Sequence, residues 1–390
     1  MHKDLIKLGE AATYINGYAF KPDDRGKVGL PIIRIQDLTG NSYDLGFYDG
    51  DYPEKIEIND GDVLISWSAS LGVYIWNNGK ALLNQHIFKV VFDKVNIDKN
   101  YFAYAVRYKL DEMGRKTHGA TMKHIVKRDF DATEIPYPSK HEQIEIANNL
   151  KRIENIIELR SHELQLLDEL IKARFVEMFG DPVQNEKGWK TKPLLDMGNC
   201  KNGMNFHYDD CGVEINCLGV GDFKDLSVIE NTEILPMVSL NEMPSEEYLL
   251  KDDDIVFVRS NGNKELVGRS LAVYPGDVPT AFSGFCIRYR KHDDEVTVPY
   301  LLRVLKAESI RLKMAGRGAN IQNLNQQILE TLIIPVPPKE LQLEFAAFVH
   351  QVDKSKLLSL IKLLEQLITY LYNVFIIYRQ DKGEEVEDHE

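Results

Sequence analysis

The chain has little of several features that would point directly to a function. Four cysteines among 390 residues are too few for the disulfide framework of a small secreted domain. No apolar run reaches the roughly 18 residues of a membrane span, because charged and amide side chains interrupt even the most apolar stretch, 357–378. The first eight residues contain no apolar run typical of a signal peptide. We therefore expect a cytoplasmic chain that does not associate with membranes.

Positive charge is also scarce in this sequence. Lys and Arg number 47 against 60 Asp and Glu, which gives a formal net charge of −13. A protein that binds nucleic acid regardless of sequence presents a basic surface that neutralises phosphates. The composition therefore excludes an indiscriminate nucleic-acid binder, and any binding of DNA must depend on local cationic loops.

Catalytic signatures are missing as well. The sequence has no GxxxxGK[ST] loop, no GxGxxG after a strand and no Asn/Asp-Pro-Pro-aromatic run of the amino-methyltransferase kind. Cys200, His207, Cys211 and Cys217 lie close together, but their spacing matches no common zinc site, so buried thiols are favoured over a metal. We expect no catalytic centre, no metal and no resident cofactor.

What the chain does contain is a duplication. Residues 135–150 read IPYPSKHEQIEIANNL and residues 334–349, 199 positions later, read IPVPPKELQLEFAAFV, with seven of sixteen positions identical and no gap. The same offset matches Tyr101 to Tyr300, and gaps elsewhere bring Asn16-Gly17 opposite Asn202-Gly203. The chain is therefore two copies of one unit of about 190 residues.

Each copy has two parts. Short runs rich in β-branched and aromatic residues predict strands, and they lie at 31–38, 62–67, 87–92, 254–259 and 285–290. Short helices are predicted at 100–109 and 299–306, which makes the first part of each copy an α+β globule. The predicted domains are globules over 1–135 and 188–333, long helices over 136–187 and 334–380, and a solvated acidic tail over 381–390.

The two long helices have recognisable starts and apolar seams. Pro138-Ser139 and Pro337-Pro338, each with an acidic residue in the following turn, predict where the helices begin. Residues spaced alternately by three and four run from Leu150 to Met178 and from Leu357 to Tyr378, which is coiled-coil spacing. We favour an antiparallel pair within the chain over a dimer between chains. The seam residues predicted to contact partner proteins are Ile153, Ile157, Leu164, Leu167, Leu360, Leu364 and Leu371.

Cationic loops occupy corresponding positions in the two copies, and neither contains an acid. In 114–128 the candidate DNA-binding residues are Arg115, Lys116, His118, Lys123 and His124, and in 309–325 they are Arg311, Lys313, Arg317, Asn320, Gln322 and Asn323. Arg and Lys pair with guanine in the major groove, whereas Asn and Gln pair with adenine. Two such loops favour a DNA-reading surface over ordinary solvated loops. Ser68, Arg259 and Asn261, in another pair of matching loops, are weaker candidates.

The order of these features resembles the specificity (S) subunit of type I restriction–modification systems. The resemblance covers the whole chain and rests on the duplication, the two helix openings, RFVEMFGDP at 174–182 with the following Gly188-Trp189, and GDVLIS at 61–66. It implies that each globule reads one half of a bipartite, asymmetric site in double-stranded DNA. It also implies that the helices set the spacer and dock two methyltransferase subunits.

The same resemblance implies a non-catalytic chain. The methyltransferase subunits, with a translocating endonuclease subunit, would carry S-adenosylmethionine, ATP and Mg²⁺, so no cofactor is expected here. The alternative is a coiled-coil scaffold or adaptor that binds protein and does not recognise a DNA sequence.

Overall fold

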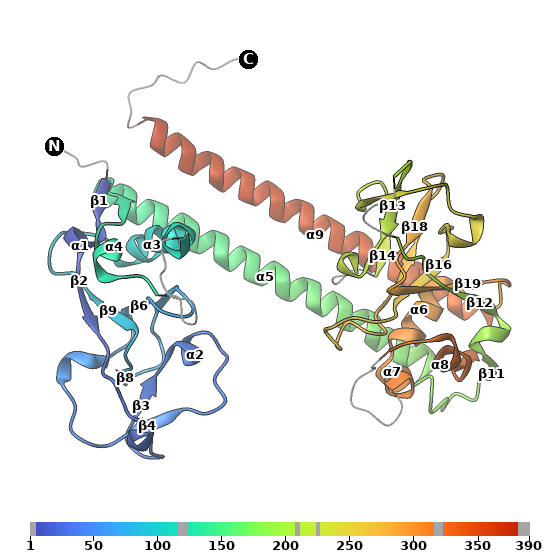
Figure 1. Cartoon of the computed structure of the whole chain (residues 1–390), viewed down its shortest axis with the longest axis horizontal. Helices are drawn as coiled ribbons and strands as arrows, with labels where there is room; N and C mark the ends of the chain where they lie inside the picture. The colour runs from blue at the N-terminus through green and yellow to red at the C-terminus, as the bar shows by residue number, and fades with distance from the viewer. Residues whose placement is uncertain (1–4, 116–123, 207–210, 224–226, 316–322, 381–390) are drawn as a thin grey trace. The chain divides into compact units, whose positions relative to one another are not determined.

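The computed structural model describes residues 5–115, 124–206, 211–223, 227–315 and 323–380, with side chains of the last helix as far as residue 368 (Figure 1). The chain divides into two compact units. One comprises Met1–Glu158 with Leu363–Glu390, and the other comprises Leu159–Lys362.

The globule of the first unit is built on two four-stranded sheets. The first sheet is antiparallel and has the order β2 (Thr13–Asn16), β9 (Ile87–Val91), β6 (Val63–Ser66), β7 (Gly72–Ile75). The second has the order β4 (Gly46–Tyr48), β3 (Leu30–Ile33), β8 (Ala81–Leu83), β5 (Glu57–Ile58), with β3 and β8 parallel. A separate pair joins β1 (Leu5–Lys7) to β10 (Glu134–Pro136).

The described residues of this globule also form the α-helices α1 (Leu8–Ala11), α2 (Ile35–Leu38), α3 (Lys99–Arg115) and α4 (Lys127–Asp131). Phe102 and Val106 of α3 are buried with Ile65 and Phe130 in the core of the unit. The strand predicted at 31–38 is half wrong, because β3 ends at Ile33. The Asp37 carboxylate accepts the backbone N–H of Arg34 at 2.8 Å and so starts a helical turn there.

The globule of the second unit repeats this plan. Its main sheet has the order β12 (Gly198–Asn202), β19 (Cys286–Lys291), β16 (Asp254–Val258), β17 (Ser270–Val273), β14 (Val228–Ile229). A three-stranded sheet has the order β15 (Met237–Leu240), β13 (Val213–Leu218), β18 (Thr280–Phe282), and β11 (Lys190–Pro193) pairs with β20 (Ile333–Val336). The shorter helices are α6 (Val298–Lys306), α7 (Glu308–Ala315) and α8 (Gln326–Glu330).

The strand registers confirm the duplication. Asn16 lies opposite Phe88 between β2 and β9, and Asn202 lies opposite Ile287 between β12 and β19. The order β2-β9-β6-β7 matches β12-β19-β16-β17, and the pair β1-β10 matches β11-β20. The predicted α+β class is confirmed for both globules.

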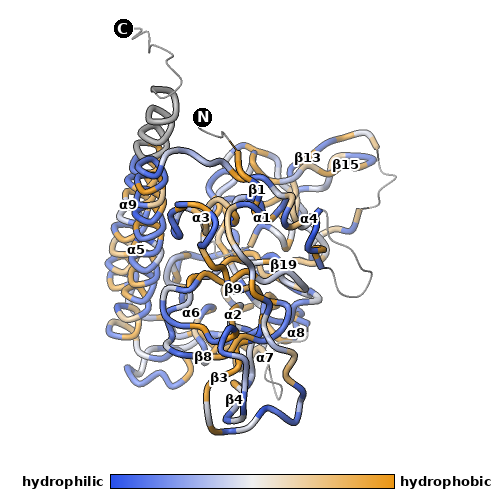
Figure 2. The backbone as a smooth tube through the Cα atoms, turned by 90° about the vertical axis from the view of Figure 1, so that its left-hand side faces the viewer, coloured by the Kyte–Doolittle hydropathy of each residue, from blue (hydrophilic) through white to orange (hydrophobic). Residues whose placement is uncertain are grey.

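Two long helices follow the globules: α5 (Lys140–Phe179) has 40 residues and α9 (Lys339–Gln380) has 42. Each begins directly after the dipeptide that predicted its start, Pro138-Ser139 for α5 and Pro337-Pro338 for α9. Hydrophobic and hydrophilic residues are interspersed along α5 and along the coloured part of α9 (Figure 2). The last turns of α5 enter the core of the second unit, where Phe175 and Phe179 pack against Tyr300 and Phe345.

Within the second unit α5 and α9 run antiparallel, as predicted. Arg174 forms an ion pair with Glu344 at 2.8 Å, and Lys356 forms one with Asp168 at 2.7 Å. The Ser359 hydroxyl donates to Glu163 at 2.9 Å. Residue numbers fall along α5 while they rise along α9, which only an antiparallel pair produces.

The buried face of α9 does not follow the predicted seam, and contact of Leu360, Leu364 and Leu371 with partner proteins stays a prediction. Phe345, Val352 and Ser359, spaced by seven, are buried, whereas Leu357, Leu360 and Leu364 are 58%, 42% and 58% exposed. This part of α9 carries leucines on several faces, so more than one line of three-and-four spacing can be drawn through it. Of the predicted residues on α5, Ile153, Leu164 and Leu167 are half-buried and Ile157 is exposed. The side chain of Leu371 lies outside the description.

In the described part of the chain, none of the helices combines the length and apolarity that crossing a lipid bilayer requires. The predicted domain boundaries stay predictions.

Candidate DNA-reading edges

Three segments of the first globule meet beyond the end of β6. The N–H of Trp67 donates to the carbonyl of His86 at 3.1 Å, and the N–H of Ile125 donates to the carbonyl of Trp67 at 3.0 Å. Ser68 forms a further bridge with His124. We call residues 67–68, 84–86 and 124–125 the β6 edge. At the β6 edge the end of the predicted cationic loop, 114–128, is hydrogen-bonded to the loop of Ser68, which is a separate candidate in the sequence.

The second globule contains the same arrangement beyond the end of β16. The N–H of Arg259 donates to the carbonyl of Phe285 at 2.8 Å, and the N–H of Leu324 donates to the carbonyl of Arg259 at 2.8 Å. We call residues 259–260, 283–285 and 323–324 the β16 edge. The two edges therefore share two backbone hydrogen bonds at equivalent positions.

The repeated Asn-Gly pair supports this scaffold. A Cβ atom on Gly17 would lie 2.0 Å from the carbonyl oxygen of Asn84, and one on Gly203 would lie 2.1 Å from that of Ser283. In both copies the chain passes so close to the turn before β9 or β19 that no side chain fits. This close approach explains why glycine stands at the same place in both copies.

The side chains on the two edges differ. Trp67 stacks on Phe88 with ring centroids 5.6 Å apart, and its indole N–H donates to Asn16 at 3.1 Å. His86 has a φ of +73° and a buried Nδ1 with no hydrogen-bond partner among the described residues, and the neighbouring Gln85 is exposed.

At the equivalent positions the β16 edge presents Arg259 and Phe285. One guanidinium nitrogen of Arg259 donates to the carbonyl of Gly284 at 3.2 Å, and Phe285 is 61% exposed. Trp67 corresponds to Arg259 and His86 to Phe285, so the same scaffold presents a different surface in each globule.

Among the candidate DNA-binding residues that lie in the described part of the chain, one group is exposed or half-buried and the other is buried or hydrogen-bonded within its own globule. Arg115, Lys313 and Asn323 are exposed, and His124 is half-buried on the β6 edge. Ser68 is buried, Asn261 accepts the N–H of Asn263 at 2.8 Å, and Arg311 donates to the carbonyl of Val267 at 3.2 Å. Burial, and then the neighbouring Arg269, lower the pKa of Arg311. Lys116, His118, Lys123, Arg317, Asn320 and Gln322 lie outside the described residues.

Sequence reasoning missed the turns before β9 and β19. Gln85, His86 and Phe285 lie there, directly before an apolar strand in each copy. A signal was present, since three polar residues, Asn84, Gln85 and His86, separate the apolar runs of β8 and β9 in the first copy. DNA contact by any named side chain stays a prediction.

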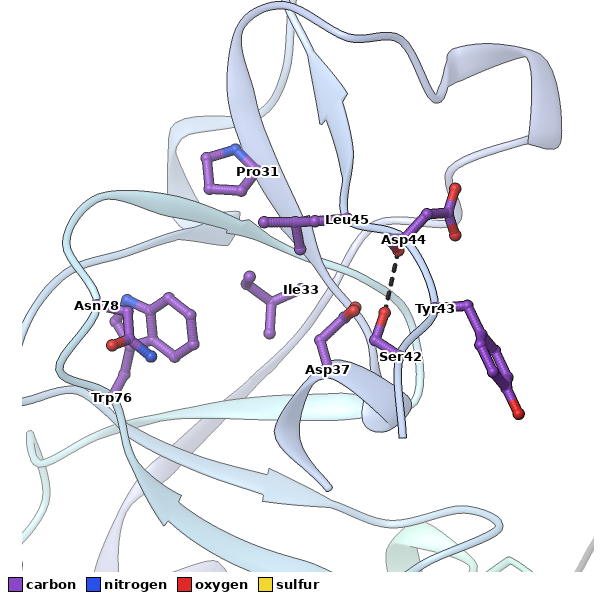
Figure 3. A pocket seen from close by; sticks show the side chains of 9 residues that line it. All are labelled: Pro31, Ile33, Asp37, Ser42, Tyr43, Asp44, Leu45, Trp76 and Asn78. Atoms are coloured by element: carbon purple, nitrogen blue, oxygen red, sulfur yellow. Dashed lines mark hydrogen bonds between the residues drawn. The ribbon is translucent and has the colours of Figure 1, made fainter. Parts of the chain in front are cut away.

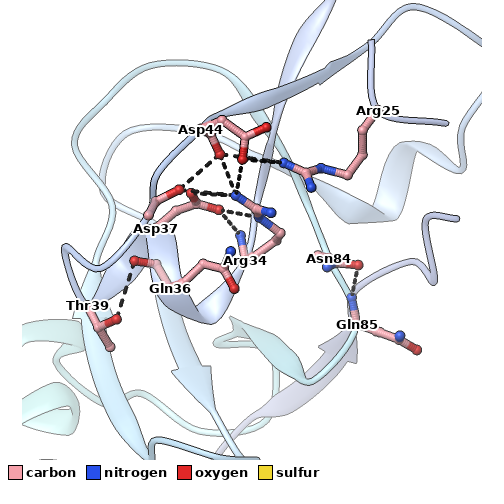
Figure 4. A network of polar contacts seen from close by, with 9 residues as sticks. Arg25, Arg34, Gln36, Asp37, Thr39, Asp44, Asn84 and Gln85 are labelled. Carbon is pink, nitrogen blue, oxygen red and sulfur yellow. Dashed lines mark hydrogen bonds and ion pairs between the residues drawn. The ribbon is translucent and has the colours of Figure 1, made fainter. Parts of the chain in front are cut away.

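Arginines elsewhere in the first globule are neutralised locally (Figure 4). Arg34 binds both oxygens of Asp37, at 3.0 and 3.3 Å, and Arg25 pairs with Asp44 at 3.2 Å. Burial raises the pKa of Asp37, but hydrogen bonds from Arg34 and Ser42 outweigh it and hold that pKa below its usual value. These arginines stabilise the loop between β3 and β4.

An open pocket of about 420 Å³ lies beside this network (Figure 3). Ile33, Leu45 and Trp76 line it together with the carboxylates of Asp37 and Asp44. Both carboxylates already pair with Arg25 or Arg34, and none of the residues that line the pocket is a Lys or Arg that could bind a phosphate.

The cysteine cluster shows only part of the predicted burial. Cys217 is buried, which raises the pKa of its thiol to about 12, and Cys200 is partly buried. Cys211 is exposed, so the prediction of a buried thiol is wrong for that residue. His207 lies outside the described residues. Across the described ranges no group of three or more His, Cys, Asp or Glu side chains is arranged to hold a metal ion.

Comparison with known proteins assigns this architecture to a family. The sequence profile of the type I restriction modification DNA specificity domain matches residues 3–169 and again residues 186–369. The chain belongs to this family, and its two matches coincide with the two copies of the duplication. It is a DNA sequence-recognition subunit and not a catalytic one.

Individual relatives agree with this assignment. The specificity subunit of the Salmonella potsdam type I restriction enzyme StySPI is 25% identical over 356 residues, covering 83% of this chain and 75% of the relative. The MjaVIII specificity subunit of Methanocaldococcus jannaschii is 22% identical over 77% of this chain and 74% of its own length. The Escherichia coli EcoBI specificity subunit is 29% identical over 43% of this chain, and the match spans only 35% of that relative.

Solved structures share the fold. The S subunit of the type I restriction–modification system of M. genitalium has a TM-score of 0.54 at 16% identity, covering 95% of this chain and 94% of the other. A chain from a study of complex assembly and conformational transition in a type I system has a TM-score of 0.55 at 14% identity, covering 95% and 96%.

Proposed function

We propose that each globule reads one half of a bipartite, asymmetric site in double-stranded DNA, within a type I restriction–modification complex in the cytoplasm. One observation carries the proposal. The β6 and β16 edges have the same backbone hydrogen bonds but present Trp67 and His86 in one globule against Arg259 and Phe285 in the other. A shared scaffold with different side chains suits two half-sites of different sequence.

The helices would set the spacer between the half-sites. At about 1.5 Å per residue, helices of 40 and 42 residues are each about 60 Å long. Half-sites one turn of DNA apart are separated by about 34–36 Å, which a helix of that length can span.

The same helices would dock two methyltransferase subunits. Large apolar side chains are exposed along α5 and α9, among them Leu159, Leu166 and Leu170 on the first and Leu357 and Leu364 on the second. Contiguous exposed apolar surface marks sites of protein contact. These partners, with a translocating endonuclease subunit, would hold S-adenosylmethionine, ATP and Mg²⁺. Because this chain has a net charge of −13, they would also supply much of the affinity for phosphates.

Mapping of DNA methylation tests the proposal. The chain is expressed with its methyltransferase subunits, and we expect the modified sequences to share one split motif. Gln85→Ala should relax only the half-site read by the β6 edge, and Arg259→Ala only the other half-site. Gln184→Ala, at an exposed glutamine outside both edges, is the matched control. Modification without an enriched split motif would favour a protein-binding adaptor, a function that family membership does not support.

A further inference from the structure

A buried glutamine joins each globule to its long helix. In the first unit Gln143 lies in the first turn of α5 and is 1% exposed. Its Oε1 accepts the backbone N–H of Asp98 at 2.8 Å, and its Nε2 donates to the carbonyl of Pro138 at 2.8 Å. Asp98 in turn accepts the N–H of Tyr101 at 2.9 Å at the start of α3. One side-chain amide therefore ties the start of α5 to the start of α3.

The second unit repeats these bonds. Oε1 of Gln342 accepts the backbone N–H of Thr297 at 2.8 Å, directly before α6, and Nε2 donates to the carbonyl of Pro337 at 2.9 Å. Nε2 also donates to the carbonyl of Glu295 at 2.9 Å. Gln342 is 0% exposed.

A tyrosine adds a third bond in both copies. The Tyr101 hydroxyl donates to the carbonyl of Pro136 at 2.9 Å, and the Tyr300 hydroxyl donates to that of Pro335 at 2.9 Å. The strand that leads into each long helix is thus held by the same shorter helix. We call Gln143 with Tyr101, and Gln342 with Tyr300, the two clamps.

The chemistry of the clamps explains part of the duplicated motif. Each glutamine binds only backbone groups, so the residue whose N–H it accepts can differ, Asp98 in one copy and Thr297 in the other. A buried apolar side chain could fill the same space, but it would leave an N–H and a carbonyl without partners. The hydrogen bonds that each residue makes therefore explain why glutamine and tyrosine stand at equivalent positions in both copies.

We propose that the clamps fix the direction in which each long helix leaves its globule and so act as positioning residues for the spacing of the two half-sites. This inference rests on the function proposed above. Because each long helix is about 60 Å long, a small tilt at its start moves its far end by a large distance. A change of about 5° at the start of a helix about 60 Å long moves its far end by about 5 Å, which exceeds the rise of about 3.4 Å per base pair.

The test uses Gln143→Met and Tyr101→Phe in the complete complex with its methyltransferase subunits. Methionine keeps the volume of the side chain but removes both hydrogen bonds, and Tyr101→Phe removes only the hydroxyl. DNA substrates carry the mapped site with its natural spacer, or with a spacer one base pair shorter or longer. We expect the preference for the natural spacer to fall by about tenfold in Gln143→Met, as loss of about two net hydrogen bonds allows. The bases preferred in both half-sites should not change.

Controls separate the clamp from stability alone. Asn148→Ala removes an exposed amide from the next turn of α5 and should leave the spacer preference unchanged. If both clamp variants keep the full preference for the natural spacer, the clamps do not position the helices. If Gln143→Met fails to fold, an unchanged preference in Tyr101→Phe alone leads to the same conclusion. A wild-type complex whose modified sites share no split motif would instead overturn the proposed function.

Discussion

Replacing Gly17 by alanine adds one methyl group where the chain passes closest to the turn between β8 and β9. The new Cβ would lie 2.0 Å from the carbonyl oxygen of Asn84 and 2.5 Å from that of Leu83, whereas ordinary contacts begin near 3.4 Å. Both neighbours are backbone atoms, which cannot swing aside as the end of a side chain can. The turn must therefore withdraw by roughly an ångström or more.

That withdrawal disrupts the hydrogen bonds that hold the β6 edge. The N–H of Tyr18 donates to the carbonyl of Leu83 at 2.8 Å, and the N–H of Gln85 donates to the carbonyl of Tyr18 at 2.9 Å. Overpacking costs about 1–3 kcal/mol, and each lost hydrogen bond costs about 1 kcal/mol. We expect Gly17→Ala to lower the free energy of unfolding by about 2–4 kcal/mol. Because Gln85 moves with the turn, recognition of the half-site read by this edge should also weaken.

Chemical unfolding measures the first effect, and methylation of DNA altered in one half-site at a time measures the second. Gly203→Ala should affect only the other half-site, since its Cβ would meet Ser283 in the same way. Gly221→Ala is the control, because a Cβ there meets no atom within 4 Å. A Gly17→Ala protein as stable as this control, with its half-site preference intact, would refute the reasoning.

Three further predictions concern single side chains. Asp254→Ala should destabilise the protein by about 3–5 kcal/mol in chemical unfolding, because the buried carboxylate binds Arg290 through two contacts of 2.7 Å; a loss below about 1 kcal/mol, the size of a surface pair, would contradict this. Phe285→Ala should change the free energy of unfolding by less than about 0.5 kcal/mol but weaken discrimination in one half-site by about 1–3 kcal/mol, as measured by methylation of altered sites, and unchanged discrimination would remove Phe285 from the reading surface. Burial, and then Arg303, lower the pKa of Lys306 from 10.5 to about 8. Between these values the unfolded chain holds a proton that the folded chain has lost, so stability should rise with pH across this window, and Lys306→Met should lack that rise.

The duplication could be found without coordinates because it appears as a repeated order of neighbouring residues. Pro136, Gln143 and their counterparts recur at one offset, and proline followed by an acidic turn predicts where α5 and α9 begin. Short runs rich in β-branched and aromatic residues likewise located β6, β9, β16 and β19 to within a residue or two, because strand propensity depends on residues close together in the chain. The error at 31–38 arose from one capping carboxylate, Asp37.

The β6 and β16 edges, which we propose read DNA, were only partly predictable from the sequence. Both cationic loops were found, but not the turns that carry Gln85 and Phe285. The bond between Trp67 and Ile125 joins positions far apart in the chain, and so does the bond between Arg259 and Leu324. Composition and spacing contain no information on such contacts.

The sequence by itself determined that the chain is two copies of a globule followed by a long helix, because repeats and helix starts depend on residues close together in order. Tertiary structure decided which face of α9 is buried, because leucines on several faces satisfy the same spacing and only packing selects among them. It also decided that each cationic loop ends against the residue that follows β6 or β16, since only the folded sheets bring these segments together.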